Sequence, residues 1–279
     1  MSAVSLELHR LNRGFHWTPP KGPYRRITAE QAKAWDEHGF VRVDDAFSAD
    51  EVNRIVAEID PLEHEVEDFL RTQKDGRFFI AQADAITFCV HLVRRSSFLR
   101  RFCGGPVFQD LAHDLIGPTV RLYWDQAVYK KPDAHREFPW HQDNGYTYVE
   151  PQGYLTCWVA LTDATIENGC PWVAPGLHRR GTLKHRMTDF GFACFDHPPS
   201  AVPVPVRAGG IVVFSSLTPH RTGPNTTSDV RKTYIVQFAP EGAKVIEEDE
   251  KTGKRAETPI ARADRQYPIL VDGVPVTPP

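Results

Sequence analysis

The segment TVRLYWDQAVYKK (residues 119–131) opens the part of the chain that decides the fold. Apolar and polar side chains alternate along it, which is the pattern of a β-strand with one buried face. Three later segments are apolar and rich in β-branched residues: YLTCWVALTDA (154–164), GGIVVFSS (209–216) and RKTYIVQF (231–238). Turn signals separate them at Asn168-Gly169 and Pro175-Gly176. Residues 119–240 therefore predict a β-rich core.

The region before this core predicts helices. Thr28 with Gln31, and Ser48 with Glu51, each match the capping box, in which side chains satisfy the first free amides of a helix. A further helical pattern begins near Phe98 and ends at Gly117-Pro118. We expect one domain over residues 1–279, with a mostly helical part (1–118), the β-rich core (119–240) and a C-terminal extension (241–279). In that extension, QYPILVDGVPV predicts an edge strand or a subunit contact.

Composition excludes several classes of partner. The formal charge of -3 gives no electrostatic reason to expect nucleic acid or an anionic membrane. The five cysteines are scattered singly, without the spacing of a zinc or redox motif. No apolar run approaches the roughly 18 residues of a membrane span, and the N-terminal residues lack the apolar core of a signal peptide. We expect a soluble, cytoplasmic protein with a small-molecule substrate; the oligomeric state stays open.

The segment WHQDNGYTYVEP (140–151) contains the first candidate metal ligands, His141 and Asp143. Residues i and i+2 of an extended segment point to the same side, so the two side chains can converge on one ion. With 12 histidines in the chain, about one His-x-Asp pair is expected by chance. His135 and Glu137 form a pair of equal formal merit, although they follow Lys131-Pro132 in an expected loop. Other parts of a site are therefore needed.

His220 and Arg231 can supply those parts. A centre that activates oxygen on Fe(II) needs two histidines and one carboxylate, so the third ligand must come from a distant strand. His220 directly follows an apolar strand, whereas His178 and His185 lie in a connection where we expect surface histidines. Arg231 opens the next strand, and its guanidinium matches a carboxylate. The alternative for Arg231 is a surface residue paired with Asp229.

Taken together, these motifs resemble the phytanoyl-CoA dioxygenase family of Fe(II)/2-oxoglutarate oxygenases. The likeness includes AWDEHGFVRVDDAFSADEV (34–52), the ordered ligand set, and LTCWVALTDATIENGCPWVAPGLHRRG (155–181). It implies a mainly β fold with flanking α-helices, a double-stranded β-helix (jelly roll, cupin-like). It also implies Fe(II), O₂ and 2-oxoglutarate as cofactor and cosubstrates. The implied site residues are His141, Asp143 and His220 on the metal, and Arg231, Thr222, Gln126 and Trp158 on 2-oxoglutarate.

The same likeness implies the reaction: hydroxylation of a small-molecule C–H bond with release of succinate and CO₂. Tyr146 and Tyr148 are candidate substrate contacts, and their alternative is aromatic packing at the barrel rim. Strict alternation would turn both tyrosines outward, but a turn at Asn144-Gly145 would reset that count. Two other functions remain open: a cupin-like metalloenzyme that does not use 2-oxoglutarate, and a non-catalytic jelly-roll binding module.

Overall fold

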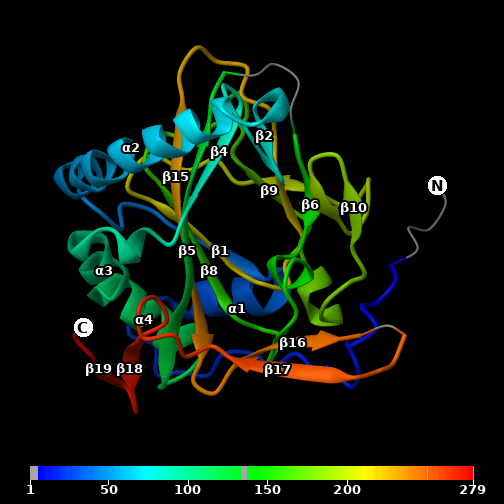
Figure 1. Cartoon of the computed structure of the whole chain (residues 1–279). Coiled ribbons are helices and arrows are strands. Elements are labelled where there is room, and N and C mark those ends of the chain that lie inside the picture. Colours follow the sequence, from blue (N-terminus) through cyan, green and yellow to red (C-terminus); the bar gives the residue numbers. More distant parts are fainter. Residues whose placement is uncertain (1–5, 133–136, 250, 279) are drawn as a thin grey trace.

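Two antiparallel β-sheets face each other across the interior of the molecule (Figure 1). The computed structural model describes residues 6–132, 137–249 and 251–278. The larger sheet contains, in spatial order, β1 (Phe40–Val43), β13 (Ile211–Ser215), β8 (Leu155–Ala160), β15 (Arg231–Pro240), β5 (Val120–Lys130), β4 (Ile86–Val90), β3 (Ala81–Gln82) and β2 (Arg77–Phe78). The smaller sheet contains β12 (Val202–Pro203), β9 (Pro171–Val173), β14 (His220–Thr222) and β6 (Phe138–His141). This confirms the predicted jelly roll.

The interior of the jelly roll is lined by the inward face of the larger sheet. Register places Ile235 of β15 between Trp158 of β8 and Gln126 of β5. Side chains alternate between faces along a strand, so Arg231 and Thr233 share the face of Ile235. This face therefore carries polar residues toward the smaller sheet, and the opposite face is free to pack against helices.

Four helices cover that opposite face (Figure 1): α1 (Ala29–His38), α2 (Ala49–Arg71), α3 (Ser97–Cys103) and α4 (Pro106–Leu115). Both predicted capping boxes are present, at Thr28 for α1 and at Ser48 for α2. Gly39 ends α1 with φ 81°, a conformation that glycine adopts without steric cost. One apolar core joins these helices to the sheet, with contributions from Ile55, Leu99, Phe108, Cys157 and Val236.

The N-terminal part is mostly helical and also contributes strands to the larger sheet. Strands β1 and β4, both before residue 118, extend the larger sheet by pairing with β13 and β5. The helical stretch that begins near Phe98 is two helices, because Gly104 and Gly105 separate α3 from α4. Pro106 then takes the first position of α4, where its missing N–H costs no hydrogen bond.

The C-terminal extension forms two hairpins. The charged segment folds as β16 (Lys244–Glu248) and β17 (Arg255–Pro259), and β16 also pairs with β7 (Val149–Glu150). The predicted edge strand is β18 (Pro268–Val271), which pairs with β5 and with β19 (Val274–Pro275). The competing ligand His135 lies outside the described residues. Among the described residues, no helix is both long and apolar enough to cross a membrane.

Candidate metal centre

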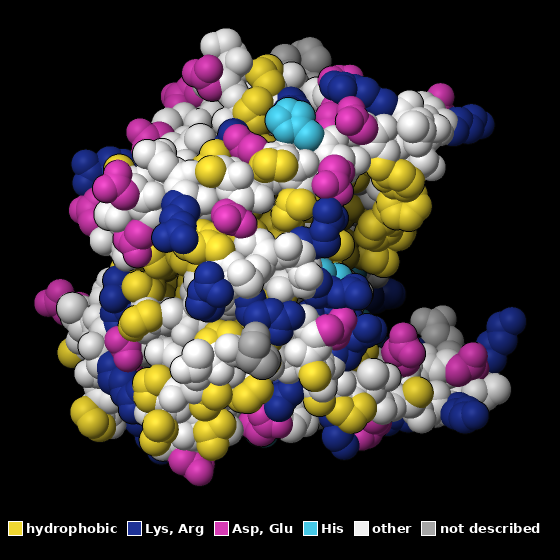
Figure 2. Space-filling view, turned by 60° about the vertical axis from the view of Figure 1, so that its left-hand side comes forward, with side chains coloured by type: hydrophobic (Ala, Val, Ile, Leu, Met, Phe, Trp, Pro, Cys, Tyr) yellow, Lys and Arg dark blue, Asp and Glu magenta, His cyan; other side chains and the backbone are white. Residues whose placement is uncertain are grey.

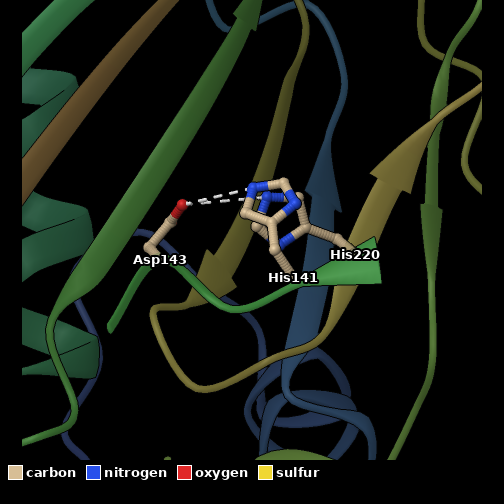
Figure 3. Close-up of side chains that lie close together, drawn as sticks. All are labelled: His141, Asp143 and His220. Atoms are coloured by element: carbon tan, nitrogen blue, oxygen red, sulfur yellow. Dashed lines mark ion pairs between the residues drawn. The ribbon is translucent and has the colours of Figure 1, made fainter. Parts of the chain in front are cut away.

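Three side chains from two distant segments meet between the sheets (Figure 3). His141 ends β6, His220 begins β14, and the register of these strands places the two residues opposite each other. Asp143 faces both rings, with its Oδ1 3.9 Å from His141 Nε2 and 3.8 Å from His220 Nε2. One donor atom from each residue lies within 4.8 Å of the other two. The three donors can therefore share one ion.

Asp143 lies on a turn, which corrects the prediction that both ligands of the pair are on one strand. Strand β6 ends at His141, and Asp143 begins the 3₁₀ turn Asp143–Gly145. Gln142 between them has extended backbone, with φ -108° and ψ 142°. Because one extended residue separates them, His141 and Asp143 still point to the same side.

Hydrogen bonds orient both imidazoles. His141 Nδ1–H donates to the carbonyl of Pro139 at 2.8 Å, and His220 Nδ1–H donates to the carbonyl of Thr218 at 3.0 Å. Each bond fixes the tautomer that leaves the Nε2 lone pair free for a metal. The second oxygen of Asp143 accepts a hydrogen bond from Thr156 at 2.6 Å, which leaves Oδ1 as the donor atom toward the ion.

Burial shapes the charge of this centre. It lowers the pKa of His141 to about 3 and that of His220 to about 4, so both rings are neutral at pH 7. Burial also raises the pKa of Asp143, because the carboxylate loses water. Two neutral imidazoles and one carboxylate on one side of an ion are the donor set of the non-haem Fe(II) oxygenases. The residues present therefore fit Fe(II).

Gln142 holds the ligand-bearing segments together. Its side chain is fully buried, and its amide nitrogen donates to the carbonyls of Gly181 at 3.0 Å and Leu217 at 2.6 Å. Its amide oxygen accepts from Leu183 N at 2.6 Å. Leu217 lies three residues before His220, so one side chain joins the two segments that carry the three ligands. This role was not predicted, although the position of the glutamine between His141 and Asp143 is visible in the sequence.

Arg231 is buried in the same interior. Its guanidinium lies 5.2 Å above the centroid of the Trp158 ring, and Nη1 donates to the hydroxyl of Thr233. Its Nε has no hydrogen-bond partner, and no acidic side chain of the described residues forms an ion pair with it. Burial lowers the pKa of Arg231 to about 10. The surface alternative with Asp229 is therefore wrong, and the buried cation fits an anionic ligand.

Lys130 lies beside this arginine and contacts Thr222. Lys130 stands opposite Arg231 in the β5–β15 register, and its ammonium donates to the Thr222 hydroxyl at 3.2 Å and to the carbonyl of Gly223. The hydroxyl of Thr222, a predicted 2-oxoglutarate contact, thus already accepts a hydrogen bond from Lys130, which was not among the predicted site residues. Thr233 was also missed, although it shares a strand face with Arg231 at position i+2.

Gln126 and Trp158 occupy the same inward face. They flank Ile235, and Gln126 Oε1 accepts from Trp124 Nε1 at 3.3 Å. Trp158 contacts Arg231 directly. The structure therefore places Trp158 next to the guanidinium, and Gln126 two strands away from Trp158.

The side chains of Tyr146 and Tyr148 have different surroundings. The Tyr146 ring lies edge-on to His141, with 5.3 Å between ring centroids, and the 3₁₀ turn before it accounts for this inward direction. Tyr148 instead stacks on His9 at 4.7 Å and donates its hydroxyl to the carbonyl of Leu11. Tyr148 is thus tied to the N-terminal segment, which agrees with the alternative of aromatic packing and not with a substrate contact.

Two histidines expected at the surface are largely buried. His178 lies edge-on to Trp17 and bonds to the carbonyl of Asp36 through Nε2. His185 Nε2 accepts the backbone N–H of Gln142 at 2.9 Å, and its ring occupies the space where a side chain at Gly145 would lie. His185 thus supports the turn that carries Asp143.

Comparison with known proteins identifies the family. The sequence model of the family described as Phytanoyl-CoA dioxygenase (PhyH) matches residues 35–233, which is more than half of the chain. The chain belongs to the phytanoyl-CoA dioxygenase family. Since the donor set also fits Fe(II), this family member is an Fe(II)- and 2-oxoglutarate-dependent oxygenase, as the sequence predicts.

Individual relatives agree with this membership of the phytanoyl-CoA dioxygenase family. Phytanoyl-CoA dioxygenase domain-containing protein 1 from Mus musculus is 28% identical over 261 residues, which cover 76% of this chain and 90% of that protein. The solved carbocyclase SnoK from nogalamycin biosynthesis has a TM-score of 0.67 at 24% identity, over 80% of this chain and 89% of that chain. EctD from S. alaskensis has a TM-score of 0.64 at 20% identity, over 88% and 86%. Both structures share the fold.

Proposed function

We propose that this oxygenase hydroxylates a C–H bond of a small molecule, with His141, Asp143 and His220 as the iron ligands and Arg231 as the anchor of 2-oxoglutarate. The buried guanidinium of Arg231 carries this proposal, because it has an unpartnered Nε and no ion-pair partner among the described side chains. A dicarboxylate supplies the missing anion. A cupin-like enzyme without this cosubstrate would need a different anion to pair with this buried cation.

Each residue has a defined task in this mechanism. Iron with 2-oxoglutarate and O₂ supplies the oxidative chemistry, in which decarboxylation to succinate and CO₂ accompanies hydroxylation of the substrate. His141 and His220 would hold the ion through Nε2, and Asp143 would hold it through Oδ1. Arg231 binds and orients the distal carboxylate in a fork that a point charge cannot match. The buried walls exclude water from the reacting atoms.

We propose a small-molecule substrate and do not adopt the substrate of any single relative. SnoK is described as a carbocyclase, and EctD was solved with 5-hydroxyectoine, so one fold carries different reactions on different small molecules. Asp143 further favours hydroxylation, because a halogenating relative needs that position open for chloride. The substrate's own geometry at the metal then sets the outcome.

Anaerobic titration with Fe(II) and then 2-oxoglutarate tests the proposal. We expect one Fe(II) per chain and a visible charge-transfer band when 2-oxoglutarate is added. Asp143→Ala should bind no iron, and Asp229→Ala serves as the control because Asp229 is exposed. Iron uptake without a band would exclude 2-oxoglutarate and favour the cupin-like enzyme. Failure to bind iron at all would leave only a binding module.

A further inference from the structure

Exposed apolar side chains gather at the ends of two hairpins. One hairpin joins β2 to β3 and carries Phe78 and Phe79, which are 59% and 58% exposed. The other joins β10 (Arg186–Thr188) to β11 (Gly191–Ala193) and carries Met187 and Phe190, which are 57% and 39% exposed. In the space-filling view, hydrophobic side chains gather beside a hollow in the surface (Figure 2). Apolar groups clustered in this way mark a binding surface more often than singly exposed ones do.

The two hairpins meet although they are distant in sequence. Arg77 donates to the carbonyl of Asp189, and its guanidinium lies 5.6 Å from the centroid of the Phe190 ring. Ile80 and Phe190 line one pocket, together with Ala85, Ile86, Lys130, Glu137 and Phe138. The hairpin ends therefore form one rim around this pocket.

Aromatic rings continue from this rim to the metal centre. The Phe138 ring lies edge-on to His141, with 4.9 Å between centroids, and Phe88 lies 5.8 Å from Phe138. Tyr146 flanks His141 on another side, and its hydroxyl accepts the backbone N–H of Phe192 at 3.1 Å. That bond ties the β10–β11 hairpin to the ligand turn. A continuous aromatic wall thus leads from the surface to an iron ligand.

The two charged residues of this pocket already have partners. The Lys130 ammonium bonds to Thr222 and Gly223, and the Glu137 carboxylate pairs with the Arg221 guanidinium. An ionic group entering the pocket would lose water without gaining a new ion pair. An apolar group would instead release water from the rings and gain contact area.

We infer that the substrate of this oxygenase is an apolar small molecule that enters at the rim and packs its carbon skeleton against Phe190, Phe138 and Tyr146. This inference rests on the proposed function, since the wall ends at the proposed iron ligand His141. The occupant is a substrate and not a partner surface, because the apolar side chains continue inward to that ligand.

Binding of the neutral apolar dye Nile red to the metal-free full-length protein tests the inference without turnover. We expect saturable binding at one site per chain, about tenfold weaker in Phe190→Ser because one ring contact is lost. Ile166→Ser is the matched control, since Ile166 is 50% exposed, belongs to the turn before β9 and does not line the pocket. Equal binding by both variants, or no saturable binding, would overturn the inference. The inference would also be overturned if the wild-type protein were a dimer and Phe190→Ser were a monomer.

Succinate formation provides the second measurement. With Fe(II), 2-oxoglutarate and O₂, we expect naphthalene, limonene or decanol to stimulate succinate release, and proline, glucose or choline to have no effect. Phe190→Ser should lower the stimulation and leave the anaerobic charge-transfer band unchanged. Stimulation by the polar compounds alone would contradict an apolar substrate. Absence of the band in wild-type protein would instead refute the proposed function, and the dye measurement would still decide on the apolar site.

Discussion

The His220 ring lies 4.2 Å from the His141 ring, centroid to centroid, because strands β14 and β6 pair with these two residues opposite each other. Sheet register, and not local sequence, thus brings the third candidate ligand to the other two. A one-residue slip of β14 would turn His220 to the other face of the smaller sheet. The contacts that fix this register should therefore control metal affinity.

Gln142→Leu should weaken both Fe(II) binding and the fold. The substitution leaves the carbonyls of Gly181 and Leu217 and the amide of Leu183 without partners in a buried site. Each buried unsatisfied group costs about 1–3 kcal/mol, so we expect a loss of several kcal/mol in the free energy of unfolding. Anaerobic calorimetry and urea unfolding measure the two effects.

Gln73→Leu is the control for this substitution, because Gln73 is only partly buried at the end of α2 and its amide bonds locally to Phe69 and Thr72. It should leave iron affinity unchanged. Equal iron affinity in Gln142→Leu and wild-type protein would show that Gln142 does not position the ligands.

Gly145→Ala should disturb the turn that carries Asp143. A Cβ at this position would lie 2.1–2.3 Å from three atoms of the His185 ring. The ring must move, which breaks its bond to the Gln142 amide, and we expect a loss of about 1–3 kcal/mol in the free energy of unfolding together with weaker iron binding.

Gly153→Ala provides the comparison, since only one atom, 4.0 Å away, lies near its Cβ position. The double variant Gly145→Ala/His185→Ala should recover part of the lost stability, because removal of the ring relieves the clash. If the single variant unfolds at the wild-type urea concentration, the turn has room that the structure does not show.

Two kinds of feature could be predicted from the sequence: those set by residues close together in the chain, and those for which the chemistry requires particular residue types. The capping boxes at Thr28 and Ser48 depend on residues three apart, and both occur. The pair His141 and Asp143 needed only one extended residue between them to converge. The sequence around Arg231 does not by itself show that this residue is buried, because its burial depends on the whole sheet. The prediction for Arg231 therefore depended on the other residues of the site.

The remaining differences come from contacts between segments distant in sequence. Strand β4 has five residues and joins the sheet by pairing with β5, so local pattern cannot place it. The β10–β11 hairpin has three-residue strands and was expected as a plain connection. Tyr148 was a candidate substrate contact because it lies near the ligands in sequence, but its packing on His9 is a tertiary contact. Pairing and packing of this kind override short-range preference.

Arg231→Met should raise the KM for 2-oxoglutarate about 100-fold. A charge-assisted bond contributes about 1.5–3 kcal/mol, and the lost fork makes more than one such bond. The metal-free protein should not lose stability, because the guanidinium there is a buried cation with an unpartnered Nε. Thermal unfolding tests this: 2-oxoglutarate with Zn²⁺ in place of iron should raise the Tm of wild-type protein and not that of the variant.

The exposed Arg207 offers a control, since Arg207→Met removes the same charge from the surface, where the side chain is 76% exposed. It should retain the wild-type KM and the stabilisation by 2-oxoglutarate. An unchanged KM in Arg231→Met would remove Arg231 from the cosubstrate site.

Asp125→Asn should change how stability depends on pH. Asp125 lies under α3 on the outer face of the larger sheet, where it accepts bonds from Tyr234 and from the amide of Val93. Burial raises the pKa of Asp125 from 3.8 to about 6. The folded state therefore holds this proton more tightly than the unfolded state. Its contribution to stability is complete below about pH 4 and is lost as pH rises through about 6.

By linkage, this difference in pKa between the unfolded and folded states corresponds to about 3 kcal/mol in the free energy of unfolding. Between pH 4.5 and pH 7.5, the free energy of unfolding of wild-type protein should therefore include a decrease of up to this size from Asp125. Urea unfolding at the two pH values should show that Asp125→Asn lacks this decrease, because the amide has no proton to lose. Asp229→Asn at an exposed position should keep the wild-type pH dependence. If the Asp125→Asn and wild-type curves stay parallel across this range, the carboxyl of Asp125 does not take up a proton on folding.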